Sequence, residues 1–287
     1  MRSGFPLAPL TSFRLGGPAA LYLELESTND LDAVAEAVVQ TGVRFAVIGK
    51  GSNLLVADEG FPGLVVRLGR SYRWAAREGD RMRAGGAMPL PALAGVALTH
   101  GLAGLEFGVA IPASVGGSVR MNAGAHGHAL DEVLDTIDVF DIEEGEVRAI
   151  PATEAGFGYR SSGLPDPGVV VAAGFTLVPG DPAGIRAAME EARAWRRATQ
   201  PLAEPNCGSV FKNPPGDHAA RLIEAAGGKG LSIGGARVSE KHSNFIVTGP
   251  GARAQDVLGL MSLLRERVRD QFDVELEPEV QLVGPET

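Results

Sequence analysis

One segment constrains the fold of this chain more than any other, because residues 101 to 127 combine many glycines and alanines with almost no charge. The segment reads GLAGLEFGVAIPASVGGSVRMNAGAHG. Glycine loses more conformational freedom on folding than other residues, so the pair Gly116-Gly117 weakens a fold unless bare backbone is needed there. Such backbone can approach a flat ligand and bind it through free N–H and C=O groups. A glycine-rich buried loop between strands is the alternative.

The composition is that of a globular protein rather than a disordered one. The chain has 287 residues, of which 45% are hydrophobic and 21% are charged, enough for one large or two to three small domains. Pro112 and several glycines interrupt the apolar region from Gly108 to Val119, so we expect no membrane insertion. The N-terminal residues lack the basic and apolar regions of a secretory signal, which favours a cytoplasmic location.

The net charge and the single cysteine argue against other classes of protein. The formal net charge of −9 argues against a nucleic-acid-binding surface. Cys207 stands alone, which excludes an internal disulfide and a cysteine-rich zinc site. The five histidines lack metal-ligand spacing, so we predict no bound metal. Basic residues, mostly arginines, gather between Arg193 and Lys241; they either form a local anion site or are ordinary solvated side chains.

Apolar periodicity and turn residues predict the main helices and strands. Four helices are predicted. The first begins within Thr28-Asn29-Asp30 and ends at Gly42, and the second runs from Pro89 to Thr99 before Gly101. The third runs from Asp181-Pro182 to about Thr199, and the fourth from about Ala252 to Phe272. The predicted strands include a hairpin of residues 137–140 and 147–150, and a final strand from Val274 to Val283 with alternating apolar residues. The last helix is expected to bury one face, formed by Val257, Leu260, Met261, Leu264 and Val268.

A glycine loop, Gly49 to Asn53, follows a short apolar strand predicted at residues 44–48. It matches neither G-x-x-x-x-G-K-[ST] nor G-x-G-x-x-G, because Leu54 stands where the third glycine of the second motif would be. Successive backbone N–H groups in such a turn can form an anion-binding nest, to which Ser52 and Asn53 add donors. A plain turn is equally consistent with these residues.

Three polar residues are candidates for chemistry, although each also has an ordinary structural interpretation. Ser209 follows a glycine in a tight turn, but no G-x-S-x-G motif surrounds it, so a hydrolase nucleophile fits poorly. Arg160 follows Phe-Gly-Tyr and could bind a carboxylate or pair with a surface acid. Glu279 lies on the polar side of the predicted final strand, where a solvated side chain is the default.

Eight sequence blocks, taken in order, resemble those of the UDP-N-acetylenolpyruvoylglucosamine reductase family. They are TSFRLGG, VIGKGSNLLV, AGGAMPLPAL, GLAGLEFGVAIPASVGGSVRMNAGAHG, FGYRSS, CGSVFKNP, IGGARVSEKHSNFIV and VELEPEVQLVG. The resemblance implies an α+β fold of the vanillyl-alcohol-oxidase/PCMH FAD-binding type, with two subdomains and a C-terminal α+β substrate-binding domain. The implied boundaries are 1–69, completed by 271–287, for subdomain 1, 70–199 for subdomain 2, and 200–270 for the substrate domain.

The resemblance also implies a non-covalently bound FAD and NADPH as the hydride donor. By this likeness the loop from Gly49 to Leu55 cradles the FAD pyrophosphate. The implied cofactor-binding residues are Gly49, Lys50, Gly51, Ser52, Asn53, Leu54, Leu55, Gly85, Gly86, Ala87, Ile111, Pro112, Ser114, Gly116, Gly117, Asn122, Ala123 and Gly124.

The reaction implied by the resemblance reduces the enolpyruvyl group of a UDP-sugar to give UDP-N-acetylmuramate, a step in peptidoglycan precursor synthesis. Hydride passes from NADPH to FAD and then to C3 of the substrate. By the same likeness Ser209 donates a proton to C2, while Arg160 and Glu279 polarise and stabilise the substrate carboxylate. The implied substrate-binding residues are Arg196, Lys212, Asn213, Lys229 and Arg237.

The chain departs from the longer type within this family. The interval between Arg160 and Ser209 has no room for an extra substrate-covering loop, so the chain is similar to the shorter second type. Two other functions stay open: an FAD oxidase of the same fold acting on another alcohol or lactone, and a flavin-binding protein without catalysis. No obligate protein partner is expected.

Overall fold

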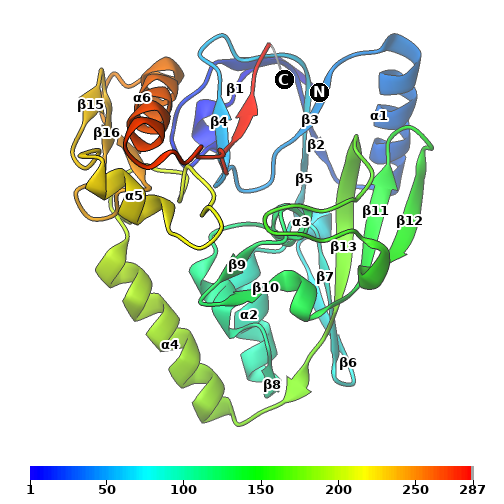
Figure 1. Ribbon diagram of the computed structural model, residues 1–287. Coiled ribbons are helices and arrows are strands. Elements are labelled where there is room, and N and C mark those ends of the chain that lie inside the picture. Colours follow the sequence, from blue (N-terminus) through cyan, green and yellow to red (C-terminus); the bar gives the residue numbers. More distant parts are fainter. Residues whose placement is uncertain (286–287) are drawn as a thin grey trace. The chain divides into compact units, whose positions relative to one another are not determined.

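The computed structural model describes residues 1–285, and the chain divides into two compact units of helices and strands (Figure 1). Unit 1 consists of Met1, Tyr22–Lys50 and Gly63–Arg196. Unit 2 consists of Arg2–Leu21, Gly51–Pro62 and the chain from Arg197 onward. Of the predicted segment 271–287, residues 286 and 287 lie outside the described residues. No helix within residues 1–285 has both the length and the apolar character needed to cross a membrane.

The largest sheet of unit 1 has five antiparallel strands in the order β12-β11-β13-β7-β6. The strands are β6 (Ala75–Glu78), β7 (Arg81–Gly85), β11 (Leu134–Asp141), β12 (Glu146–Pro151) and β13 (Gly168–Thr176). The predicted hairpin is confirmed, because β11 and β12 are consecutive and pair with each other. The central strand, β13, is buried from Gly168 to Phe175, which agrees with its run of apolar residues.

Four α-helices begin in unit 1. They are α1 (Thr28–Thr41), α2 (Leu90–Thr99), α3 (Val115–Arg120) and α4 (Pro182–Thr199). Side-chain caps mark the start of α1 and α3. The predicted cap of α1 was wrong by one residue: Ser27 is the N-cap, and it exchanges hydrogen bonds with Asp30 in a capping box. The predicted stops are confirmed, because Gly42 and Gly101 both have a φ of 64° after their helices.

A second sheet has the strand order β1-β2-β5-β3. Its strands are β1 (Arg2–Pro6), β2 (Pro18–Leu25), β3 (Phe45–Val47) and β5 (Phe61–Leu68). Strands β2 and β5 each have residues in both units. β3 pairs in parallel with the part of β5 that belongs to unit 1, and Ile48 N–H continues the pairing by donating to Val66 O at 2.9 Å. This pairing fixes the start of the glycine loop beside the end of β5.

The main core of unit 1 brings these elements together. Leu90 and Leu93 of α2, Met189 of α4 and Phe175 of β13 all belong to one cluster of buried side chains. Short antiparallel pairs complete the unit, namely β8 (Leu102–Ala103) with β14 (Val178–Pro179), and β9 (Gly124–Ala125) with β10 (His128–Ala129).

Unit 2 packs two helices against a small sheet. The helices are α5 (Ala219–Ala225) and α6 (Ala254–Phe272), and the sheet holds β15 (Ser232–Ile233), β16 (Ala236–Val238) and β17 (Ile246–Thr248). The prediction for the last helix is confirmed, because its five expected core residues are all buried: Val257, Leu260, Met261, Leu264 and Val268.

The predicted final strand from Val274 to Val283 was wrong over most of its length. Only β18 (Gln281–Val283) is a strand, and it pairs in parallel with β4 (Leu54–Val56). Pro278 has no N–H to donate and makes only an isolated bridge with Phe211. The alternation fails as well, because Leu282 is 44% exposed although it was expected on the apolar side.

Candidate functional site

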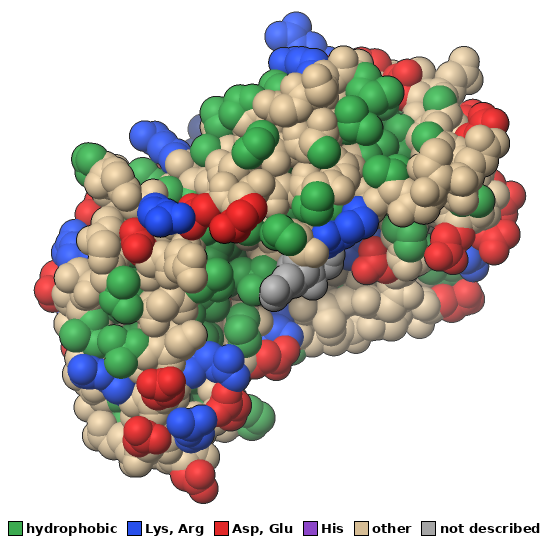
Figure 2. All heavy atoms as spheres, turned by 90° about the horizontal axis from the view of Figure 1, so that it is seen from above, with side chains coloured by type: hydrophobic (Ala, Val, Ile, Leu, Met, Phe, Trp, Pro, Cys, Tyr) green, Lys and Arg blue, Asp and Glu red, His purple; other side chains and the backbone are tan. Residues whose placement is uncertain are grey.

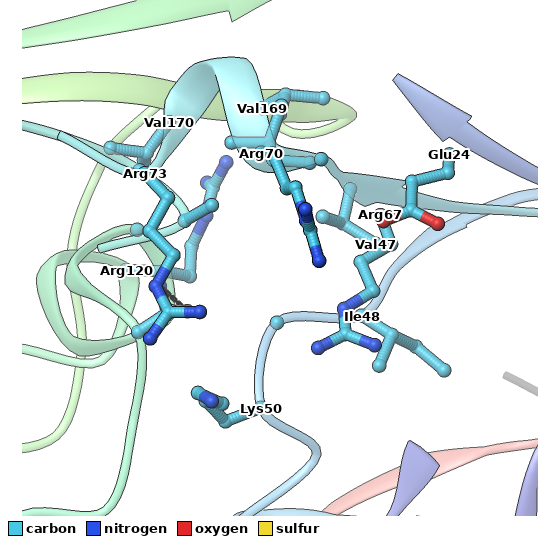
Figure 3. Close-up of a pocket in the computed structure, with 18 of the residues that line it drawn as sticks. Glu24, Val47, Ile48, Lys50, Arg67, Arg70, Arg73, Arg120, Val169 and Val170 are labelled. Carbon is cyan, nitrogen blue, oxygen red and sulfur yellow. Dashed lines mark hydrogen bonds between the residues drawn. The ribbon is translucent and has the colours of Figure 1, made fainter. Parts of the chain in front are cut away.

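Unit 1 contains a cavity of about 280 Å³. It lies where the residues after β3, the end of β5 and its following turn, α3 and the start of β13 come together (Figure 3). All residues that line it belong to unit 1. The lining has two different parts, a wall of close-packed backbone and a wall of basic side chains.

The backbone wall is built by close packing around Gly86. Its N–H donates to Val171 O at 2.7 Å, and its carbonyl oxygen accepts from Gly116 N–H at 2.9 Å. A Cβ on Gly86 would lie 2.1 Å from Val170 O, which is far inside van der Waals contact. Glycine is therefore required at this position by the packing of the wall itself.

The glycine loop after β3 meets helix α3 in the same wall. A Cβ on Gly49 would lie 2.4 Å from Ser114 Oγ. Ser114 is buried and caps α3, where its hydroxyl accepts a hydrogen bond from Gly117 N–H at 3.4 Å. Part of the glycine content of residues 101–127 thus serves close packing around the cavity.

The second wall carries basic side chains. Lys50, Arg67, Arg70 and Arg73 extend toward the same space from different positions along the chain (Figure 3). Within residues 1–285, none of these four side chains forms a salt bridge or a side-chain hydrogen bond. Glu24 is the single acidic residue of the lining.

Arg120 also lines the cavity but is held differently. Its guanidinium donates to Leu164 O at 3.1 Å and to Gly168 O at 2.9 Å. Burial lowers the pKa of this guanidinium, and Asp166 partly opposes the shift. Arg120 therefore tethers α3 to the segment that precedes β13 while adding positive charge to the lining.

The donors of this cavity fit an anionic group with several oxygens. Unpaired arginine forks and a lysine ammonium bind phosphate oxygens well, and a concave site with one acidic and five basic side chains concentrates positive potential. The diphosphate of FAD has this chemistry. The residues present therefore suit the cofactor that the sequence resemblance implies.

The structure divides the residues predicted to bind FAD into three groups. Seven of them line the cavity: Gly49, Lys50, Gly86, Ala87, Ser114, Gly116 and Gly117. Six lie in unit 1 outside the lining: Gly85, Ile111, Pro112, Asn122, Ala123 and Gly124. Five belong to unit 2, where Asn53 Nδ2 donates to Glu279 O at 3.0 Å: Gly51, Ser52, Asn53, Leu54 and Leu55.

Sequence reasoning missed the arginines at the end of β5. Arg67, Arg70 and Arg73 follow one another at intervals of three residues, the first near the end of β5 and the other two after it. Regularly spaced arginines around Gly69 could have indicated an anion-binding turn. The longer basic region between Arg193 and Lys241 competes with this signal because it contains more cations.

In unit 2 a backbone hydrogen bond brings the segment that carries Ser209 next to the segment that carries Glu279. Ser209 forms an isolated bridge with Phe245, and Glu279 N–H donates to the carbonyl oxygen of the next residue, Val210, at 2.9 Å. Gly208, which precedes Ser209, has a φ of 84°, a left-handed conformation that glycine adopts without strain. Cys207 is buried, and burial raises the pKa of its thiol.

Asn244 supports this part of unit 2. Its side chain accepts from Phe211 N–H at 3.1 Å and donates to Phe211 O at 2.8 Å. Because Phe211 is fully buried, these hydrogen bonds hold the chain that carries Ser209 in a fixed path.

Arg160 belongs to unit 1 and lies in a constrained turn. Its φ of 57° is unusual for a residue with a side chain, its Nη2 donates to Gly124 O at 3.1 Å, and its guanidinium lies over the Tyr159 ring. Asn122 Nδ2 donates to Gly158 O at 3.1 Å. The turn that carries Arg160 is therefore fastened to the end of the glycine-rich segment.

The predicted substrate-binding residues have varied environments. In unit 2, Lys212 pairs with Glu277 at 2.5 Å, Lys229 with Glu224 at 3.2 Å, and Arg237 with Glu204 at 2.9 Å. The other two residues differ: Asn213 Oδ1 accepts from Ala219 N–H at 3.1 Å, and burial lowers the pKa of Arg196 in unit 1.

Comparisons with known proteins agree with this arrangement. Residues 200–283 match the family described as UDP-N-acetylenolpyruvoylglucosamine reductase, C-terminal domain, and residues 19–150 match the family described as FAD binding domain. The α+β fold with an FAD-binding domain expected from the sequence is thereby confirmed.

Relatives match almost the whole chain. The UDP-N-acetylenolpyruvoylglucosamine reductase of Heliobacterium modesticaldum is 45% identical over 97% of this chain and 89% of its own length, and that of Carboxydothermus hydrogenoformans is 44% identical over 97% and 92%. The crystal structure of the Thermus caldophilus enzyme of this name has a TM-score of 0.83 and 37% sequence identity, covering 96% of both chains. This chain therefore belongs to the UDP-N-acetylenolpyruvoylglucosamine reductase family.

Proposed function

We propose that the protein reduces the enolpyruvyl group of UDP-N-acetylglucosamine enolpyruvate to UDP-N-acetylmuramate, with NADPH as the hydride donor, in peptidoglycan precursor synthesis. The observation that carries this proposal is the identity of 45% over 97% of the chain with a reductase of that name. The cationic cavity of unit 1 supports it independently, because its lining suits the diphosphate of the FAD cofactor.

Bound FAD would carry the hydride from NADPH to C3 of the enolpyruvyl group. In this proposal Lys50 and the backbone around Gly86 hold the cofactor in unit 1. NADP-dependent turnover, non-covalent FAD and action without an obligate protein partner are parts of the same proposal, as is a cytoplasmic location.

Three residues are proposed to act on the substrate itself. Ser209 donates a proton to C2 after hydride arrives at C3, and its fixed backbone path suits a group that must meet one carbon atom. Arg160 and Glu279 polarise the substrate carboxylate and stabilise the charge that develops beside it. Ser209 is a weak acid as a neutral hydroxyl, so its contribution depends on this placement.

The domain layout of the proposal follows the resemblance. Residues 1–69 with 271–287, together with 70–199, form the two FAD-binding subdomains, and residues 200–270 form the substrate-binding domain. Arg196, Lys212, Asn213, Lys229 and Arg237 are proposed to bind the UDP-sugar.

An anaerobic stopped-flow experiment tests the function in two stages. NADPH is expected to bleach the flavin absorbance of the purified protein, and the enolpyruvyl UDP-sugar is expected to restore it. Ser209→Ala is expected to leave the first stage nearly unchanged and to slow the second by orders of magnitude, about 10²-fold or more for loss of a general acid. A reduced flavin that only oxygen reoxidises would instead indicate an oxidase of the same fold.

A further inference from the structure

Three arginines of the basic wall lie outside the sequence blocks that identify the family, whereas Lys50 lies within one of them. Arg67, Arg70 and Arg73 lie between two of those blocks, at the end of β5 and in the turn after it. We propose that these three arginines form a side-chain clamp for the diphosphate of the dinucleotide cofactor, and that Glu26 holds the clamp in place. The proposal rests on the FAD-dependent function proposed above and adds residues to its cofactor site.

The positively charged side chains of the clamp have no salt-bridge partner among the described residues. The protein has a formal net charge of −9, yet no carboxylate within residues 1–285 forms a salt bridge with Arg67, Arg70 or Arg73. Arginines that crowd one cavity repel each other, and a dianion placed between them relieves that repulsion. Because three guanidinium groups offer more N–H donors than the two oxygens of one carboxylate can accept, the clamp suits the more numerous oxygens of a diphosphate.

Glu26 supports the turn that carries the clamp. Its carboxylate accepts hydrogen bonds from Arg70 N–H at 3.1 Å and from Ser71 N–H at 2.9 Å. Its backbone oxygen accepts from the Ser71 hydroxyl at 2.5 Å. Glu26 therefore directs its hydrogen bonds to the turn rather than to the guanidinium groups of the clamp.

Gly69 shows that this support is close-packed. A Cβ at Gly69 would lie 2.3 Å from the carboxyl carbon of Glu26, so a side chain there would displace the carboxylate from the turn. The 3-10 helix η2 (Arg70–Tyr72) follows directly. Its Tyr72 carbonyl accepts from Ala87 N–H at 3.1 Å, which ties the turn to the backbone wall of the cavity.

The clamp can be tested by equilibrium dialysis of the holoprotein against graded FAD. Arg67→Gln, Arg70→Gln and Arg73→Gln are each expected to weaken FAD binding about tenfold, the usual cost of one charge-assisted hydrogen-bonding group. Arg186→Gln is the matched control, because Arg186 is exposed on α4 and does not line the cavity. Added salt is expected to weaken FAD binding by the wild type more than by the triple variant.

Riboflavin, which has the same ring system and no phosphate, separates charge from shape. Its affinity is expected to be the same in the wild type and the variants, and an equal loss for riboflavin and FAD would overturn the clamp. Unchanged FAD affinity with a raised KM for NADPH would also overturn it, because the arginines would then serve the other nucleotide. Failure of the wild type to retain FAD would instead refute the proposed function.

Glu26 is tested as a positioning residue by a double-mutant cycle. Glu26→Ala is expected to weaken FAD binding in the wild-type background but to add little in the Arg70→Gln/Arg73→Gln background, because its effect passes through those arginines. Glu26→Gln keeps one carbonyl acceptor and is expected to restore part of the affinity. Equal, additive losses in both backgrounds would show that Glu26 does not act through the clamp.

Discussion

The basic side chains that line the cavity of unit 1 and those predicted to bind substrate in unit 2 have opposite environments. In unit 2, Lys212, Lys229 and Arg237 each lie within 3.2 Å of a carboxylate oxygen, whereas the side chains of Lys50, Arg67, Arg70 and Arg73 in unit 1 have no salt bridge within residues 1–285. On the face drawn in Figure 2, acidic and basic side chains are likewise interspersed. Exposed ion pairs contribute little free energy, but unpaired cations around a cavity are a binding site for an anion.

This contrast shows why a count of basic residues misplaces an anion site. The sequence interpretation directed attention to the basic region between Arg193 and Lys241, where charge density is high. The decisive property is the absence of a partner within reach, and partners such as Glu204 for Arg237 are set by the fold. A ligand that binds in unit 2 must compete with these carboxylates or use other donors.

The strongest test of the contrast removes three charges from each unit. Arg67→Gln/Arg70→Gln/Arg73→Gln is expected to weaken FAD binding roughly a thousandfold, the product of three losses of about tenfold. Arg221→Gln/Arg253→Gln/Arg269→Gln changes the charge of unit 2 by the same amount and removes ion pairs whose arginine side chains are exposed. Its FAD affinity, measured by equilibrium dialysis, is expected to stay at the wild-type value, and a comparable loss there would indicate a long-range effect of net charge.

The second test concerns the core of unit 2, where the buried Cys207 thiol stays protonated and uncharged. Burial raises the pKa of the Cys207 thiol, so the reactive thiolate is scarce even at mildly alkaline pH. Alkylation of the native protein at pH 8 is expected to be roughly a hundredfold slower than in urea, because access adds to the pKa effect. Mass spectrometry of samples quenched over time measures both rates. Fast labelling of the native protein would show that this core opens readily.

The sequence correctly predicted those structural features that depend on residues close together in the chain. The C-terminal ends of α1 and α2, the hairpin of β11 and β12, and the buried face of α6 follow from glycine stops, turns and periodicity. The predictions were wrong or incomplete where a contact between residues far apart in the chain determines the structure. Pro278 broke the predicted last strand, and the clamp depends on Glu26 reaching Ser71 across 45 residues. The family resemblance supplied the cofactor, but it could not assign a role to arginines outside the shared blocks.

The third test concerns the backbone wall that faces the arginines. Gly86→Ala places a methyl group 2.1 Å from Val170 O and is expected to destabilise the protein by about 1–3 kcal/mol, as overpacking does. Gly95→Ala in α2 is the matched control, because a Cβ there meets nothing within 4 Å. It is expected to stabilise the protein by about 0.5–1 kcal/mol through helix propensity. Urea unfolding of both variants measures the difference, and equal stabilities would contradict the close-packed wall.

The smallest expected effect is a difference between the two units in the pH at which a hydrogen-bonded carboxylate becomes protonated. Hydrogen bonds from Ser71 and Arg70 N–H lower the pKa of Glu26 below its usual 4.5, so its support of the turn is complete above pH 4.5 and is lost as the pH falls through the lowered value. In unit 2 the side chain of Arg221, with the His218 N–H, lowers the pKa of Asp217 to about 2, so that pair persists to more acidic pH. FAD affinity is therefore expected to begin to fall below pH 4.5 in the wild type. In Glu26→Gln, which does not titrate at this position, the affinity starts lower and lacks that step. A step of the same size in both proteins would assign it to other carboxylates.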